Sequence, residues 1–175
     1  LNADAFMNAE SILTGNVVLT VAQEYKKFVS KDESSVSFGD EYVTGVNKNT
    51  TVSQFKAELE NDELTVEIRD FQGNLLDEDA LVGTGATITL KSKHTDVVYD
   101  VKTVIVYGDV DGDGDVDDDD ETKVTDVAIG SDSFDEAQPY FFLAADVCNE
   151  GYINALDSWM VNLIANGFRT VLSVE

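Results

Sequence analysis

Sulfur and imidazole side chains are almost missing from this chain, which has one cysteine and one histidine among its 175 residues. The single cysteine, Cys148, excludes an internal disulfide and a zinc site of the CxxC type. The single histidine, His94, has no ligand or catalytic partner near it in the sequence. An ordinary surface histidine is therefore the better interpretation of His94.

Basic residues are also scarce, since 35 acidic and 11 basic residues give a formal net charge of −24. Nucleic acid and anionic membranes would be repelled, so neither is expected as a partner. Residues 1–107 contain 18 acidic and 9 basic residues, whereas residues 108–175 contain 17 and 2. The composition thus changes near Gly108, and cations are the natural ligands of the second segment.

The sequence also lacks long apolar runs. No stretch approaches the roughly 18 residues that a membrane helix needs, and no basic-plus-apolar signal segment opens the chain. We therefore expect that Leu1 marks a cut within the sequence of a larger protein. The content of hydrophobic residues, 43%, is nevertheless ample for packed cores.

Residues 34–107 have the pattern of a small strand-rich unit with one helix. A hydroxyl of Thr50 or Thr51 can cap a helix over residues 52–59. Strands are expected at residues 36–38, 41–43, 64–68, 86–91 and 97–106. Residues 1–33 are less regular, with one strand near 17–21 and a turn or two of helix within 22–29. They belong either to this unit or to a preceding module.

Catalytic signatures are lacking, and no residue is assigned a catalytic role. The acidic pair Asp77 and Asp79 could act as general acid and base on a sugar, but its neighbours give no sign of burial that would raise a pKa. A solvated turn is the favoured interpretation. The sequence predicts a protein that is not an enzyme.

Residues 109–120 have the spacing of an EF-hand calcium loop. Calcium is a hard cation that takes six to eight oxygen ligands. Gly114 stands where the loop turns sharply, and Val116 stands where an aliphatic side chain points into the core. The predicted ligands are the side chains of Asp109, Asp111, Asp113 and Asp120 and the backbone carbonyl of Asp115.

A second copy of this loop begins 37 residues later, with Asp146 in the place of Asp109 and Gly151 in the place of Gly114. Cys148 stands at the third loop position, where its neutral thiol is a poor calcium ligand. The sequence therefore predicts two calcium ions, the second bound more weakly. The predicted ligands of the second are Asp146, Glu150, Asp157 and the backbone carbonyl of Tyr152.

Each loop is followed by a helix of about ten residues, and the second helix has an apolar stripe. On a helical projection, Val161 marks the side that faces the core. The apolar stripe lies on the opposite side of the helix, and one of its residues lies at the border between the two sides. It consists of Leu156, Trp159 and Leu163, with Met160 at the border. Such a stripe predicts a partner-binding face, unless residues 134–143 or the upstream domain cover it.

The matching face of the first helix is polar, and it consists of Asp119, Thr122, Lys123 and Asp126. Because the two faces differ chemically, a single binding mode led by the second helix is predicted.

The duplicated loop-helix units, with Asp rather than Glu at loop position 12, resemble dockerin modules of cellulosome-type assemblies over about residues 108–167. Residues 42–46 and 82–88 resemble the X-type modules that precede some dockerins. The resemblance implies an α+β fold. It comprises a segment 1–33, a strand-rich X-module-like domain with one short helix over 34–107, and a small all-α dockerin with two calcium loop-helix repeats over 108–175.

A dockerin binds the cohesin module of a scaffold or cell-surface protein. The resemblance therefore implies a secreted bacterial docking module, extracellular or attached to the cell surface, that anchors its parent protein for polysaccharide degradation. The alternative is a calcium-responsive EF-hand-like sensor or structural domain. Sensors normally carry two helices per loop and a Glu at position 12, which disfavours this alternative.

Overall fold

The computed structural model describes residues 26–61, 63–95 and 97–168. Its elements are, in order, β1 (Ser37–Phe38), β2 (Tyr42–Thr44), α1 (Val52–Ala57), β3 (Leu64–Arg69), β4 (Thr87–Ser92), β5 (Val98–Val104), α2 (Asp118–Ala128), α3 (Pro139–Ala145) and α4 (Ala155–Ala165). The strand expected near residues 17–21 lies outside the described residues, and residues 26–29 are not helical. In the described part of the chain, none of the helices has the length and apolar character to cross a bilayer.

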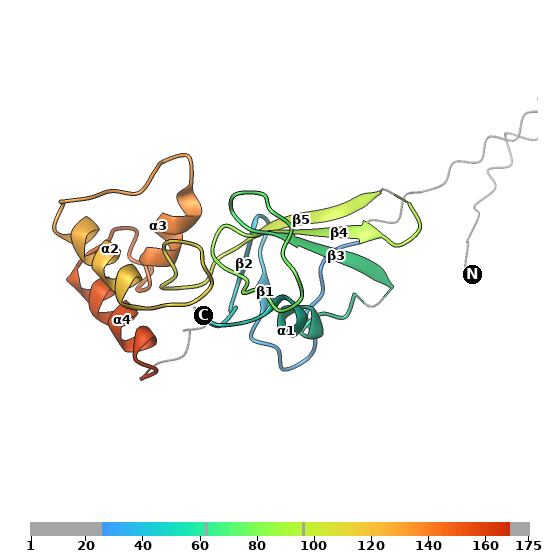
Figure 1. The fold of residues 1–175 in the computed structure, drawn as a ribbon, viewed down its shortest axis with the longest axis horizontal. Helices are drawn as coiled ribbons and strands as arrows, with labels where there is room; N and C mark the ends of the chain where they lie inside the picture. Colours follow the sequence, from blue (N-terminus) through green and yellow to red (C-terminus); the bar gives the residue numbers. More distant parts are fainter. Residues whose placement is uncertain (1–25, 62, 96, 169–175) are drawn as a thin grey trace, which may run out of the picture.

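We call residues 26–107 the sheet half. It contains one mixed sheet of five strands, in the order β1-β2-β5-β4-β3 (Figure 1). The central pair β2 and β5 is parallel, with Val43 opposite Val104. The pairs β1–β2, β4–β5 and β3–β4 are antiparallel, and Ile68 faces Ile88 across β3 and β4. These four side chains are at most 1% exposed, so the middle of the sheet lies in the core.

The helix α1 begins as the sequence predicts, with Thr51 as its cap. The amide of Gln54 donates to Thr51 Oγ1 over 3.3 Å, and the amide of Thr51 donates to Gln54 Oε1 over 2.9 Å. This reciprocal pair is a capping box, which satisfies two amides that the first turn leaves free. The helix buries Val52 and Phe55 and ends at Ala57, two residues before the predicted end.

Residues 108–168, the helical half, do not form the separate small all-α domain that the sequence suggested, and this prediction is wrong. The described residues form a mixed α/β domain with a five-stranded sheet and four helices, in which strands dominate the first half. One cluster of buried side chains runs from Phe28 to Ile164 through both halves. The three helices of this half have 11, 7 and 11 residues. Because helices this short bury little apolar surface among themselves, they share a core with the sheet.

A lysine of the sheet half ties the two halves together. The ammonium of Lys48 donates to the carbonyl of Val116 over 3.2 Å and to the carbonyl of Ala165 over 2.7 Å. Ala165 is the last residue of α4, where free carbonyls and the helix dipole favour a cation. The two halves lie side by side along the long axis of the molecule (Figure 1).

The helix α3 was not among the elements predicted from the sequence. It is only seven residues long, has no side-chain cap and starts at Pro139. Proline is well suited to the first turn of a helix because its missing amide has no partner there in any case. The ring of Phe141 packs edge-on against Phe71 of the sheet half, with centroids 5.5 Å apart. The second loop therefore has an incoming helix, whereas the first follows β5.

The shared core predicts that both halves unfold together. Val124 of α2 is completely buried, and Val124→Ala should lower the free energy of unfolding by about 2 kcal/mol. In hydrogen exchange, amides of β4 that exchange only through global unfolding should then exchange about 30-fold faster. Faster exchange confined to the helical half would contradict a single cooperative unit.

Candidate metal site

The first loop, residues 109–120, begins five residues after the end of β5, and its last three residues are the first three of α2. Gly112 and Gly114 have φ of +82° and +90°, the left-handed region that favours glycine. At the end of the loop Asp117 caps α2, because its side chain accepts from the amide of Asp119 over 2.7 Å. The backbone thus curls around a small interior before the helix begins.

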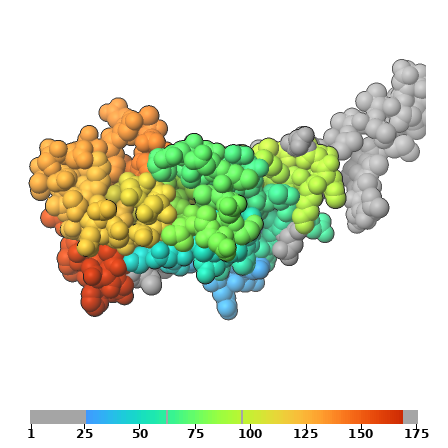
Figure 2. Space-filling view, viewed as in Figure 1, coloured from blue at the N-terminus to red at the C-terminus, as the bar shows by residue number. Residues whose placement is uncertain are grey.

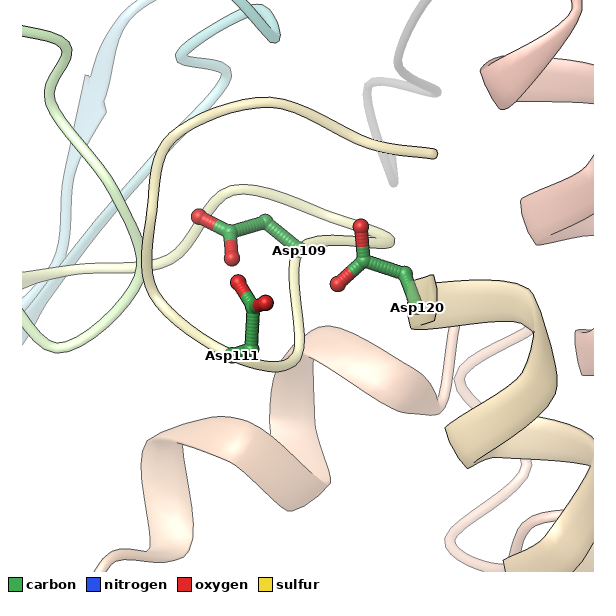
Figure 3. Close-up of side chains that lie close together, drawn as sticks. All are labelled: Asp109, Asp111 and Asp120. Atoms are coloured by element: carbon green, nitrogen blue, oxygen red, sulfur yellow. The ribbon is translucent and has the colours of Figure 1, made fainter. Parts of the chain in front are cut away.

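Three carboxylates of the first loop lie close together in this interior: those of Asp109, Asp111 and Asp120 (Figure 3). One oxygen from each lies within 4.8 Å of the others, which is close enough for all three to hold a metal ion. Asp109 is fully buried and Asp120 is 2% exposed, whereas Asp111 is open to solvent. A second group, Asp115, Asp117 and Asp120, meets the same criterion and shares Asp120 with the first.

Backbone amides orient the two buried carboxylates. Asp109 Oδ1 accepts from Gly112 over 2.6 Å, while its Oδ2 accepts from Gly114 over 3.1 Å and from Thr84 over 2.8 Å. Asp120 accepts from the amides of Val110 and Asp117, over 2.7 and 2.9 Å. The Thr84 bond comes from the sheet half, so both halves hold Asp109.

Burial opposes the charge on these carboxylates when no cation is bound. It raises the pKa of Asp109 from 3.8 to about 7, although the amides of Thr84 and Gly112 act in the opposite direction. Burial likewise raises the pKa of Asp120 to about 7, and repulsion from Asp111 and Asp113 adds to it. A bound cation would remove this penalty, since it favours the charged form.

One further atom fits a cation site. Asp115 Oδ1 is buried and has no hydrogen-bond partner among the described residues. All the converging side-chain donors are carboxylate oxygens, which suit hard cations such as calcium and magnesium. A metal ion therefore fits the residues that are present.

The structure changes the predicted ligand set of the first loop in three places. Asp113 is exposed and belongs to neither group of converging carboxylates. Asp115 brings a side-chain oxygen as well as the carbonyl that the loop pattern predicts. Asp117 was missed, although loop position 9 is a common ligand position in EF-hands and could have revealed it.

The second loop, residues 146–157, repeats the backbone plan of the first. Asp146 accepts from the amides of Glu150 and Gly151, and Asp157 accepts from those of Cys148 and Asn154. The capping box of α2, Asp117 with Asp120, recurs in α4 as Asn154 with Asp157. The duplication therefore extends to part of the hydrogen-bond pattern, since the amides of Gly151 and Asn154 correspond to those of Gly114 and Asp117.

The predicted ligands of the second loop do not converge as those of the first do. Among the described residues, no three acidic or cysteine side chains of this loop approach within ligating distance of one another. Glu150 accepts from the side-chain amide of Asn154 over 3.0 Å, and its hydrogen bond to Tyr152 raises the pKa of that phenol. Burial and the neighbouring Asp157 raise the pKa of the Cys148 thiol, which keeps it neutral.

The predicted partner face of α4 is exposed at its centre. Trp159 is 56% exposed and Leu156 is 42% exposed, while Leu163 is half-buried. Met160 is only 3% exposed and belongs to the core, so its assignment to this face is corrected. A border position on a helical projection was turned inward by packing.

Comparisons with known proteins add no relative. No family model, no curated protein and no solved structure matches this chain. The resemblance to dockerins and X-type modules therefore stays a prediction from the motifs.

The buried carboxylates predict how the stability of the metal-free chain depends on pH. In the folded chain Asp109 and Asp120 keep their protons up to a pKa of about 7, whereas in the unfolded chain they lose them near 3.8. The folded state binds more protons between these values, so with a chelator present the free energy of unfolding should fall as pH rises through this window.

Urea unfolding in chelator at about pH 5 and about pH 7.5 measures this dependence. Asp120→Asn should reduce the difference between the two, whereas Asp113→Asn, which removes only part of the repulsion that raises the pKa of Asp120, should reduce it less. Equal stability of the unmodified chain at both pH values would contradict the burial of unpaired carboxylates.

Proposed function

We propose that this chain is a non-catalytic, calcium-dependent docking module whose partner is a cohesin. It anchors a larger secreted bacterial protein to a scaffold or cell surface, in the service of polysaccharide degradation. The observation that carries the proposal is the pairing of a buried carboxylate cluster in the first loop with an exposed tryptophan on the helix after the second.

Calcium is the cation that best suits the first loop. The cluster of Asp109, Asp111 and Asp120 lies beside a second group that includes Asp115 and Asp117, so the loop offers many oxygens within one short segment. Calcium accepts six to eight such ligands in irregular geometry, whereas magnesium retains several waters and requires a near-octahedral arrangement.

The second loop should bind calcium more weakly than the first, because Cys148 offers a neutral thiol at a ligand position. Cys148→Asp supplies a carboxylate there and should raise the affinity of the weaker site at least about tenfold, since loss of even an outer-shell partner of a metal ligand typically changes affinity by that much. Cys148→Ser, which keeps the size and supplies no charge, is the matched control.

Isothermal titration calorimetry with calcium chloride measures both affinities. Two equal affinities in the unmodified chain, or a tighter second site, would contradict the inequality. So would a Cys148→Asp chain that binds calcium no better than Cys148→Ser.

The docking face is formed by α4. Trp159 and Leu156 are exposed side by side on this helix, and exposed aromatic anchors commonly provide much of the affinity of an interface. On α2 the corresponding surface is polar, and Lys123 is engaged by Asp132 at 2.5 Å and by the ring of Phe134. Because α4 carries an exposed apolar anchor and the corresponding surface of α2 is polar, a single binding orientation is proposed.

Trp159→Ala should weaken cohesin binding by at least about 2 kcal/mol, or about 30-fold, because the indole is the largest exposed apolar group of this face. The control is Asp126→Ala on the α2 face, which should change the affinity little. Surface plasmon resonance against a panel of cohesins, with calcium and with chelator, measures both. Comparable losses in the two variants, or binding unchanged by chelator, would contradict the proposal.

A calcium sensor is the second candidate, and α3 is the observation that favours it. With α3 before the loop and α4 after it, the second loop has the helix-loop-helix format of signalling EF-hands. A sensor exposes an apolar groove when calcium binds, so a hydrophobic dye would fluoresce on calcium addition. A docking module with a ready-made face would show no such increase.

A further inference from the structure

We propose that the first calcium site is built jointly by the two halves of the chain. In this arrangement the turn at residues 82–85 of the sheet half holds the first loop in its ligating shape, and Thr84 is a positioning residue for Asp109. The inference rests on calcium binding by the first loop, as proposed above. It names residues outside the loop that set the affinity of the site.

Thr84 reaches Asp109 by two routes. Its amide donates directly to Asp109 Oδ2 over 2.8 Å, which orients the carboxylate. Its hydroxyl donates to the carbonyl of Val106 over 3.1 Å and accepts from the amide of Val106 over 3.0 Å. The threonine is fully buried, so these bonds are shielded from water and hold the turn against the chain three residues before Asp109.

The turn also packs backbone to backbone against the first loop. A Cβ atom on Gly83 would lie 2.2 Å from the carbonyl oxygen of Gly112 and 2.8 Å from the amide nitrogen of Gly114. The amide of Asn49, also from the sheet half, donates to the carbonyl of Gly114 over 2.8 Å. Figure 2 shows the first loop, in yellow, lying against the green surface of the sheet half. The loop therefore rests on a surface that admits no side chain at Gly83.

The second loop has no such support in the described part of the chain. Gly151 occupies the position that Gly114 has in the first loop, and a Cβ atom on it would meet nothing within 4 Å. The amides that reach the Asp146 carboxylate come from Glu150 and Gly151, both within its own loop. The sheet half thus supports one of the two duplicated loops and leaves the other open.

This asymmetry has a thermodynamic consequence. A loop already held in its ligating shape loses less conformational entropy when it binds an ion, so its affinity is higher. Conversely, calcium that binds only the assembled loop stabilises the turn at residues 82–85 as well. The sheet half therefore does more than accompany the calcium loops, because it raises the affinity of the first one.

Gly83→Ala tests the contact directly. Gly83 does not have a positive φ, so alanine is compatible with its backbone, but the added methyl group displaces Gly112. We expect calcium affinity at the tight site to fall at least about tenfold in calorimetry with calcium chloride on the full chain. Gly39→Ala is the matched control, because Gly39 also lacks a positive φ. A Cβ atom on Gly39 would lie 3.3 Å from its nearest neighbour, the carbonyl oxygen of Tyr42.

Thr84→Val and Thr84→Ser form a second pair, which answers the question if Gly83→Ala fails to fold. Valine keeps the shape of threonine but removes both hydrogen bonds to Val106, so it should weaken the tight site and reduce the rise in Tm that calcium produces. Serine keeps the hydroxyl and should restore both. Asp111→Ala identifies which of the measured affinities belongs to the first loop.

The inference is overturned if the variants of Gly83 and Thr84 bind calcium at the tight site as the unmodified chain does. It is equally overturned if they lower the Tm by the same amount with and without calcium, since that is the signature of a purely structural role. A failure of the proposed function gives a different result: the unmodified chain itself would then take up no calcium.

Discussion

The carboxylate of Asp109 lies fully buried where the two halves of the chain meet, and the surrounding backbone is arranged around it. It accepts amide hydrogen bonds from Gly112 and Gly114 of its own loop and from Thr84 of the sheet half. Three amides go far toward solvating one carboxylate, but Asp111 and Asp120 converge on the same place. The shape of the loop and the attachment of the helical half both depend on how this negative charge is balanced.

The duplicated loops diverge because their surroundings differ. The first is enclosed by the sheet half and keeps carboxylates at its ligand positions, whereas the second is open at Gly151 and carries Cys148 instead. The helices that follow the two loops also differ in their exposed faces. The helix α4 exposes Trp159, whereas α2 exposes polar groups. In the proposed account the first repeat supplies the strong calcium site and the second supplies the docking face, with Lys48 connecting Val116 of one to Ala165 of the other.

Features that depend on short-range interactions were predictable from the sequence. The cap of α1 at Thr51, the turn at Gly114 and the convergence of Asp109, Asp111 and Asp120 all follow from residues within about twelve positions of one another. Features that depend on distant contacts were not. Thr84 reaches Asp109 across 25 positions, Met160 is turned inward by packing, and the shared core joins the helical half to the sheet half.

The central claim is that the carboxylates at the junction of the two halves bind calcium, and anomalous diffraction from crystals grown with calcium chloride tests it most directly. The account predicts one strong anomalous peak between Asp109, Asp111 and Asp120, with oxygens about 2.3–2.6 Å away, and the Thr84 amide still bonded to Asp109. A second, weaker peak is expected in the loop of Asp146 and Asp157. A first loop without an ion, or one in which the Thr84 bond is broken when the ion is bound, would contradict the account.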